Sequence, residues 1–171
     1  MSEITTVIVD MVGSTQIEQD IGIKGMTQIK NELMESISTV ANRTRGRIAN
    51  FFGDGALIIF KDQDSIFNAC FFISKLLSQL SEENTNTRGK YNPIHLKCGI
   101  DHGNVSCLND GVNLSGMPIN ISARLANICK PDQVLVASPI AQLGKKRGMS
   151  FSAGIIVNIK GIGKITVYEF K

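Results

Sequence analysis

Two aspartates stand at positions where packing alone gives little reason for a charge. Asp10 follows the apolar, β-branched run Ile4–Val9, and Asp54 occupies a turn between Gly53 and Gly55 with apolar, strand-like residues on both sides. An ionised carboxylate at the end of a buried strand costs several kcal/mol when no positive charge lies beside it. A divalent cation is a natural partner for two such carboxylates, so the pair predicts a metal site.

Each aspartate also has a simpler explanation. A Gly-Asp-Gly sequence is by itself more often a tight turn. Asp10 alone fits a cap for the following helix, for which Thr15 and Glu18 form a predicted capping box. The turn Gly13–Thr15 also offers backbone N–H groups to an anion at a helix N-terminus. Together, the two carboxylates and this turn favour Mg²⁺ and a nucleoside triphosphate.

A second pair of polar residues, Asn120 and Arg124, lies four positions apart on a predicted helix. This spacing places both side chains on one helix face. An amide beside a guanidinium suits a ribose and a charged phosphoryl group. The alternative is an ordinary solvated helix face with a surface arginine.

The composition excludes several classes of protein. The chain has 171 residues, of which 43% are hydrophobic and 19% charged, and its net charge is +3. This balance argues for a packed core rather than disorder. The charge is too small for the concentrated basic face of a nucleic-acid binder. No apolar run approaches about 18 residues, so no membrane partner or spanning segment is expected.

The cysteines and the N-terminus indicate the compartment. The four cysteines form no CxxC pair, and the first residues show neither a basic stretch nor a cleavage pattern. A zinc site, a disulfide framework and a secretory signal are therefore not expected. We expect a cytoplasmic protein.

The elements that must position these residues follow from hydrophobic periodicity. Strands are predicted at 4–12, 94–101, 104–108 and 134–137, with two further pairs at 47–60 and 152–170. Helices are predicted from the mid-20s to about 42 and over 66–80, 118–130 and 139–146, and 81–93 is predicted to be a loop. Gly103 is expected to turn the chain between two of the strands. This order predicts one α+β domain over residues 1–171, with a ferredoxin-like sheet and covering helices.

Five segments carry a wider pattern: VIVDMVGST, FFGDGALIIF, KCGIDHGNVS, SGMPINISARLANICKPDQVLVAS and IKGIGKITVYEF. Their order and spacing, from Val7 to Phe170, resemble the catalytic domains of class III nucleotidyl cyclases. The resemblance implies an enzyme that converts a nucleoside triphosphate to a 3′,5′-cyclic nucleotide and pyrophosphate. It also implies two divalent cations, Mg²⁺ or Mn²⁺, as cofactors.

The resemblance assigns roles position by position. Asp10 and Asp54 resemble the two metal-binding aspartates, with the carbonyl of Met11 as a further ligand. The turn after the first strand resembles the one whose amides hold the terminal phosphates: Gly13, Ser14 and Thr15.

Asn120 and Arg124 resemble the pair that orients the ribose and stabilises the α-phosphoryl transition state. In this family each site lies between two chains, with the aspartates from one chain and the Asn/Arg helix from the other. A chain that carries both halves is therefore expected to form a homodimer with two shared active sites.

Two positions depart from the family's purine-reading residues. Adenylyl cyclases have Lys and Asp there, and guanylyl cyclases typically have Glu and then Cys or Ser; this chain has Asn50 and Asn113. An amide donates and accepts, so this pair suits several base edges. The alternative is an ordinary strand residue and an ordinary loop residue. The family's triphosphate lysine falls near Ile162, which makes Lys160 or Lys164 the candidate, and we take Lys160.

A compact cyclase without purine-reading residues is similar to the bacterial pyrimidine cyclases of antiphage signalling. That similarity implies cyclic UMP or cyclic CMP as product and a downstream cyclic-nucleotide effector protein as partner. Two alternatives remain: an adenylyl cyclase that makes cyclic AMP, and a catalytically silent dimer that binds nucleotide.

Overall fold

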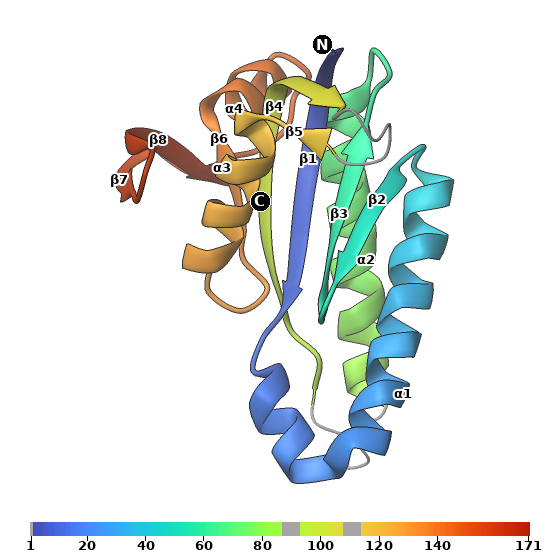
Figure 1. Ribbon diagram of the computed structural model, residues 1–171. Helices are drawn as coiled ribbons and strands as arrows, with labels where there is room; N and C mark the ends of the chain where they lie inside the picture. Colours follow the sequence, from blue (N-terminus) through green and yellow to red (C-terminus); the bar gives the residue numbers. More distant parts are fainter. Residues whose placement is uncertain (1, 87–92, 108–113) are drawn as a thin grey trace.

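The computed structural model describes residues 2–86, 93–107 and 114–171, and its strands and helices follow the predicted order (Figure 1). The strands are β1 (Ser2–Met11), β2 (Arg47–Phe52), β3 (Gly55–Phe60), β4 (Leu96–Cys107), β5 (Leu114–Ser115), β6 (Val134–Ala137), β7 (Ile155–Ile159) and β8 (Gly163–Glu169). The helices are α1 (Ser14–Arg43), α2 (Ser65–Asn86), α3 (Met117–Ile128) and α4 (Ser138–Lys145). The predicted α+β class is confirmed.

The strands form one mixed sheet in the order β2-β3-β1-β4-β6-β8-β7, with β5 paired to β4. The pair β4–β6 is parallel and the other pairs are antiparallel. Alternate residues of β1 enter two different cores, because successive side chains of a strand point to opposite faces. Val7 and Val9 pack with α1, α2 and α4, whereas Ile4 and Ile8 pack on the side of α3.

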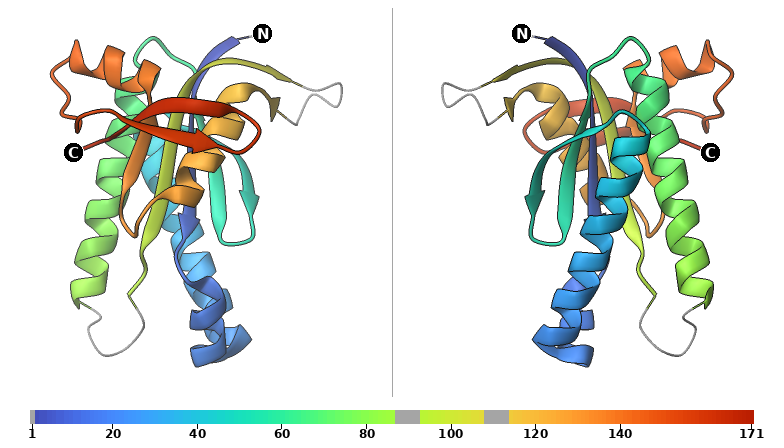
Figure 2. Two further views of the ribbon diagram at one scale, coloured as in Figure 1. Left: turned by 90° about the vertical axis from the view of Figure 1, so that its left-hand side faces the viewer. Right: turned by 90° about the vertical axis from the view of Figure 1, so that its right-hand side faces the viewer.

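The two faces of the sheet are therefore covered unequally. Three helices cover one face, where α1 and α2 lie side by side (Figure 2). Of the described helices, α3 is the one on the other face, where the β2–β3 and β7–β8 hairpins flank it. This sparsely covered side, called here the α3 face, is the one that bears on function.

Helix α3 lies directly against β4 because Gly99 has no side chain. A Cβ atom at this position would lie 2.0 Å from the carbonyl oxygen of Ser122 and 2.7 Å from the backbone nitrogen of Ala126. No other residue allows this approach, since both obstructing atoms belong to the helix backbone. Gly99 thus sets the height and position of the helix that carries Asn120 and Arg124.

Two predictions about β4 and its surroundings were wrong. Gly103 does not turn the chain: β4 continues through it to Cys107, and its short antiparallel partner is β5. A Cβ at Gly103 would lie 3.1 Å from Pro118 Cγ, so this glycine serves the close approach of α3. Helix α2 also extends to Asn86, so 81–86 is helical rather than a loop.

The predicted capping box at the start of α1 is also absent. The N-cap residue is Gly13, and no side chain caps the helix, so Thr15 and Glu18 both lie inside it. The helix starts at Ser14, well before the mid-20s, and continues across a kink at Gly22. No described helix is long and apolar enough to cross a membrane.

One carboxyl group is buried beneath α3. Asp101 is 4% exposed and lies directly opposite Thr6 of β1 in the antiparallel register. Thr6 Oγ1 lies 2.8 Å from Ser122 Oγ of α3, so the helix covers this region. Burial raises the pKa of Asp101 to about 6, and a hydrogen bond from the backbone N–H of His102 offsets only part of the shift.

Removal of this charge should change how stability depends on pH. The pKa is higher in the folded chain than in the unfolded chain, so the folded state holds the proton more tightly. This tighter proton binding adds to the free energy of unfolding below about pH 4. The contribution is lost as the pH rises through about 6, a loss of up to about 3 kcal/mol. Asp101→Asn should therefore resist urea better than the wild type at neutral pH and lose this advantage near pH 4.

The matched control is Asp64→Asn, which removes an exposed carboxyl and should show no such pH-dependent gain. Equal urea midpoints for Asp101→Asn and the wild type at neutral pH would contradict the burial of an ionised group at this position.

Candidate active site

The sheet brings Asp10 and Asp54 to the same end of the neighbouring strands β1 and β3. Asp10 lies opposite Gly55 in the β1–β3 register, and the backbone N–H of Met11 donates to the Asp54 carbonyl oxygen at 3.3 Å. Gly55 permits this approach, since a Cβ there would lie 2.6 Å from the Val9 carbonyl oxygen and 3.2 Å from Asp10 Oδ1. Figure 1 shows the end of β1 and the β2–β3 turn at the same end of the sheet.

The negative charges of Asp10 and Asp54 repel each other. The pKa of Asp10 is raised above its ordinary value, first by burial and then by the negative charge of Asp54, while Lys97 acts in the opposite direction. Lys97 is the direct partner of Asp10 on β4. This lysine was not among the predicted site residues. Its only signal was a charge within an apolar strand, and its relation to Asp10 depends on the strand register.

This donor set fits a divalent cation. Two half-buried carboxylates gain from a positive ion between them, and the Met11 carbonyl stands next to Asp10 in the chain. The described residues contain no group of three or more His, Cys, Asp or Glu side chains that could hold a metal by themselves. Mg²⁺ is commonly bound by one or two carboxylates together with substrate phosphates, and this edge provides the protein's share of such a set.

The first turn of α1 provides an anion site beside the carboxylates. Gly13 adopts a left-handed conformation with φ of +67°, and the first hydrogen bond of the helix runs from the N–H of Ile17 to its carbonyl. The N–H groups of Ser14, Thr15 and Gln16 therefore have no acceptor within the helix. With no side-chain cap, this turn is suited to phosphate oxygens.

Asn120 and Arg124 lie one turn apart on α3 and are both exposed. The buried residues of this helix, among them Ser122 and Ala126, face the sheet. Among the described residues, no hydrogen bond or ion pair joins the Asn/Arg pair to Asp10, and Arg124 is not one of the charges that shift the pKa of Asp10. The structure thus places the Asn/Arg pair and the two aspartates on different elements, α3 and the β1–β3 strand pair.

The remaining predicted residues occupy different parts of the sheet. Asn50 is exposed on the edge strand β2 and lies opposite Leu57, whose side chain packs on the α3 face. Lys160 is exposed in the β7–β8 turn, at the opposite edge of the sheet. Asn113 lies outside the described residues.

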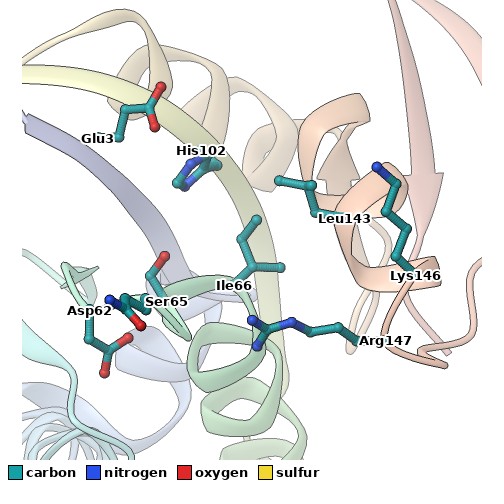
Figure 3. A pocket seen from close by; sticks show the side chains of 9 residues that line it. Glu3, Asp62, Ser65, Ile66, His102, Leu143, Lys146 and Arg147 are labelled. Atoms are coloured by element: carbon teal, nitrogen blue, oxygen red, sulfur yellow. The ribbon is translucent and has the colours of Figure 1, made fainter.

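A hollow of about 360 Å³ at the other end of β1 is separate from these residues (Figure 3). Two of its lining residues, His102 and Ser65, contact the buried Thr5: Thr5 Oγ1 lies 3.0 Å from His102 Nδ1 and donates to Ser65 Oγ at 3.0 Å. Arg147 extends from the end of α4 and pairs with Asp64. These contacts join β1, β4, α2 and α4, so His102 belongs to the packing of the fold.

Several solved structures share this fold. The adenylyl cyclase CyaB from P. aeruginosa has a TM-score of 0.86 and 17% sequence identity, with 99% of this chain and 93% of that chain covered. The guanylate cyclase domain of RhGC from Catenaria anguillulae, in complex with GTP, has a TM-score of 0.85 and 19% identity, with 99% and 96% covered. The non-canonical dimeric guanylyl cyclase domain of the RhoGC fusion protein from Blastocladiella emersonii has a TM-score of 0.80 and 18% identity, with 99% and 96% covered.

No curated protein matches the chain at a significant level. The family described as the adenylate and guanylate cyclase catalytic domain, however, matches residues 1–171. The members of this family are lyases that make cyclic nucleotides, and they generally use divalent metals. The chain belongs to the adenylate and guanylate cyclase catalytic domain family and is a nucleotidyl cyclase domain.

Proposed function

We propose that residues 1–171 form one catalytic domain, and that two copies convert a nucleoside triphosphate to a 3′,5′-cyclic nucleotide and pyrophosphate at two shared sites. The observation that carries this proposal is that Asp10 and Asp54 lie at the same end of β1 and β3, beside the uncapped first turn of α1. This end of the sheet combines oxygen ligands for cations with amide donors for phosphates.

The residues of the chain divide the work by their chemistry. Asp10, Asp54 and the Met11 carbonyl would hold two divalent cations, Mg²⁺ or Mn²⁺, which when bound supply Lewis acidity at the ribose 3′-hydroxyl and at the triphosphate. The amides of Gly13, Ser14 and Thr15 bind the terminal phosphates. Lys160, which lies in the β7–β8 turn away from these amides, would reach the same phosphates from the second copy.

The second half of each site comes from α3. Asn120 orients the ribose, and the Arg124 guanidinium stabilises the charge that develops on the α-phosphoryl group. Because nucleophile and phosphorus belong to one molecule, these positioning contacts supply much of the catalysis.

Homodimerisation is supported by what the α3 face leaves exposed. Asn120 and Arg124 are exposed there without a partner among the described residues. Exposed apolar side chains accompany them, with Phe52 39%, Ile128 50% and Ile155 56% exposed. Apolar surface of this kind commonly marks an interaction site. A second copy facing this side would bring its Asn/Arg helix to the carboxylates.

We further propose a pyrimidine substrate, with cyclic UMP or cyclic CMP as product. Support comes from Asn50, whose exposed amide lies on the α3 face and has neither the ammonium nor the carboxylate of the purine cyclases. The proposed role is antiviral signalling to a separate effector protein, in line with the resemblance to antiphage cyclases. The free, buried cysteines Cys70, Cys98 and Cys129 support a reducing compartment such as the cytoplasm.

Asp10→Asn tests the metal site without any assay of activity. Without metal, the variant should melt at a higher temperature than the wild type at neutral pH, because the raised pKa of Asp10 means that its charge destabilises the fold. Mn²⁺ should raise the melting temperature of the wild type and have little effect on the variant. Glu35→Gln, an exposed change on α1, is the control and should retain the Mn²⁺ response. An equal Mn²⁺-induced rise in the melting temperature of Asp10→Asn would contradict a metal site at Asp10.

A product assay with Mn²⁺ and ATP, GTP, CTP and UTP tested separately identifies the substrate. We expect a cyclic pyrimidine nucleotide, no product from Asp54→Ala, and a turnover reduced about 100- to 1,000-fold in Arg124→Ala. Cyclic AMP would preserve the mechanism and overturn the pyrimidine assignment. If no product forms from any of the four nucleotides, a dimer that binds nucleotide without catalysis would be favoured.

Mixing the two variants tests whether the sites are shared. Asp54→Ala and Arg124→Ala each damage both sites of their own homodimers. After chain exchange, about half of the dimers are mixed and each has one intact site, so activity should recover to about a quarter of the wild type. A mixture as inactive as its components would show that each site lies within one chain.

A further inference from the structure

A second hollow on the α3 face has a floor that the proposed activity does not use. Its volume is about 370 Å³, and it lies beside the N-terminal half of α3. Its walls include the apolar residues Met117, Pro118, Ile121, Ala137, Pro139 and Ile165. The buried carboxyl of Asp101 lies at its floor, because this side chain points to the α3 face of β4.

This hollow is separate from the part of the candidate active site that Asp10, Asp54 and Asn50 form, and it shares helix α3 with Asn120 and Arg124. Its lining comes from β4, α3, the β6–α4 junction and β8. In the sheet, β6 and β8 lie on one side of β4, whereas the strands that position Asp10, Asp54 and Asn50 lie on the other. A molecule in this hollow would contact α3 on the side that faces β8.

Asp101 finds no counter-charge within the described part of the chain. Apart from His102, whose side chain is bonded to Thr5 on the opposite face, no other lining residue is charged. Nearby hydroxyls are already engaged, since Ser138 Oγ donates to the Thr166 carbonyl oxygen at 3.0 Å. The pKa of about 6 leaves the carboxyl mostly ionised at neutral pH, where a buried charge without a partner is unfavourable.

We propose that this hollow is a binding site for a small amphipathic amine. The ammonium group pairs with the carboxylate of Asp101, and the hydrocarbon part packs against Ile121 of α3 and Ile165 of β8. This class of ligand follows from the hollow itself. Its walls are apolar and its one buried ionisable group is a carboxylate, so a cation with an apolar body fits both. The proposal goes beyond the cyclase activity and does not depend on it.

A titration of the ¹⁵N-labelled full chain with n-hexylamine tests this site, with n-hexanol and hexanoate as matched probes. Hexylamine should bind with a dissociation constant on the order of a millimolar, as expected for a ligand of this size. The amides of Gly103, Met117 and Ser138 should show the largest shifts. Hexanol, which lacks the charge, should bind at least about 10-fold more weakly, and hexanoate should not bind.

Asp101→Asn keeps the shape of the side chain and should abolish the preference for hexylamine over hexanol. Asp64→Asn, an exposed change just before α2, should leave it intact. Met117→Ala removes an exposed wall residue without touching the carboxyl, and should weaken both probes together. The proposal is overturned if hexylamine fails to bind the wild type, binds Asp101→Asn equally well, or shifts the amides around Asp10 instead.

Discussion

The pairing of β1 with both of its neighbours is the constraint on which the proposed site depends. β1 lies between β3 and β4, and this double register sets Asp10 opposite Gly55 on one side and Lys97 on the other. The sheet thereby holds Asp10 near Asp54 although burial and like charge both disfavour it. Cooperative strand pairing over a buried core outweighs this local repulsion and leaves a site in which a cation is stabilising.

The position of α3 follows from a second close contact, which also sets the direction of Asn120 and Arg124. Because Gly99 lets the helix rest on β4, its small and apolar side chains face the sheet while Asn120 and Arg124 point outward. The same contact closes Asp101 beneath the helix. One packing arrangement therefore exposes Asn120 and Arg124, for which we propose a role in a second copy's site, and buries the carboxyl of Asp101, for which we propose a cationic ligand.

Much of the fold was predictable because it depends on local periodicity. The strand at 134–137 and the helix with Asn120 and Arg124 appear as expected, and so does the order of all elements. The failures occur where a residue's role depends on distant partners. Gly103 was expected to make a turn but accommodates Pro118, and the first turn of α1 has Gly13 as its cap, where Thr15 and Glu18 were expected to form a capping box. The pairing of Lys97 with Asp10 has no local signal.

The amino-acid sequence by itself determined which chemical groups the chain carries, the order of its strands and helices, and the family to which it belongs. These features reside in residue types and in spacings along the chain. The tertiary structure decided which groups meet: the shared edge of Asp10 and Asp54, the outward direction of Arg124 and the burial of Asp101. The reason is physical, since strand register and burial arise from contacts between segments far apart in the chain, and these contacts set the electrostatic surroundings of each group.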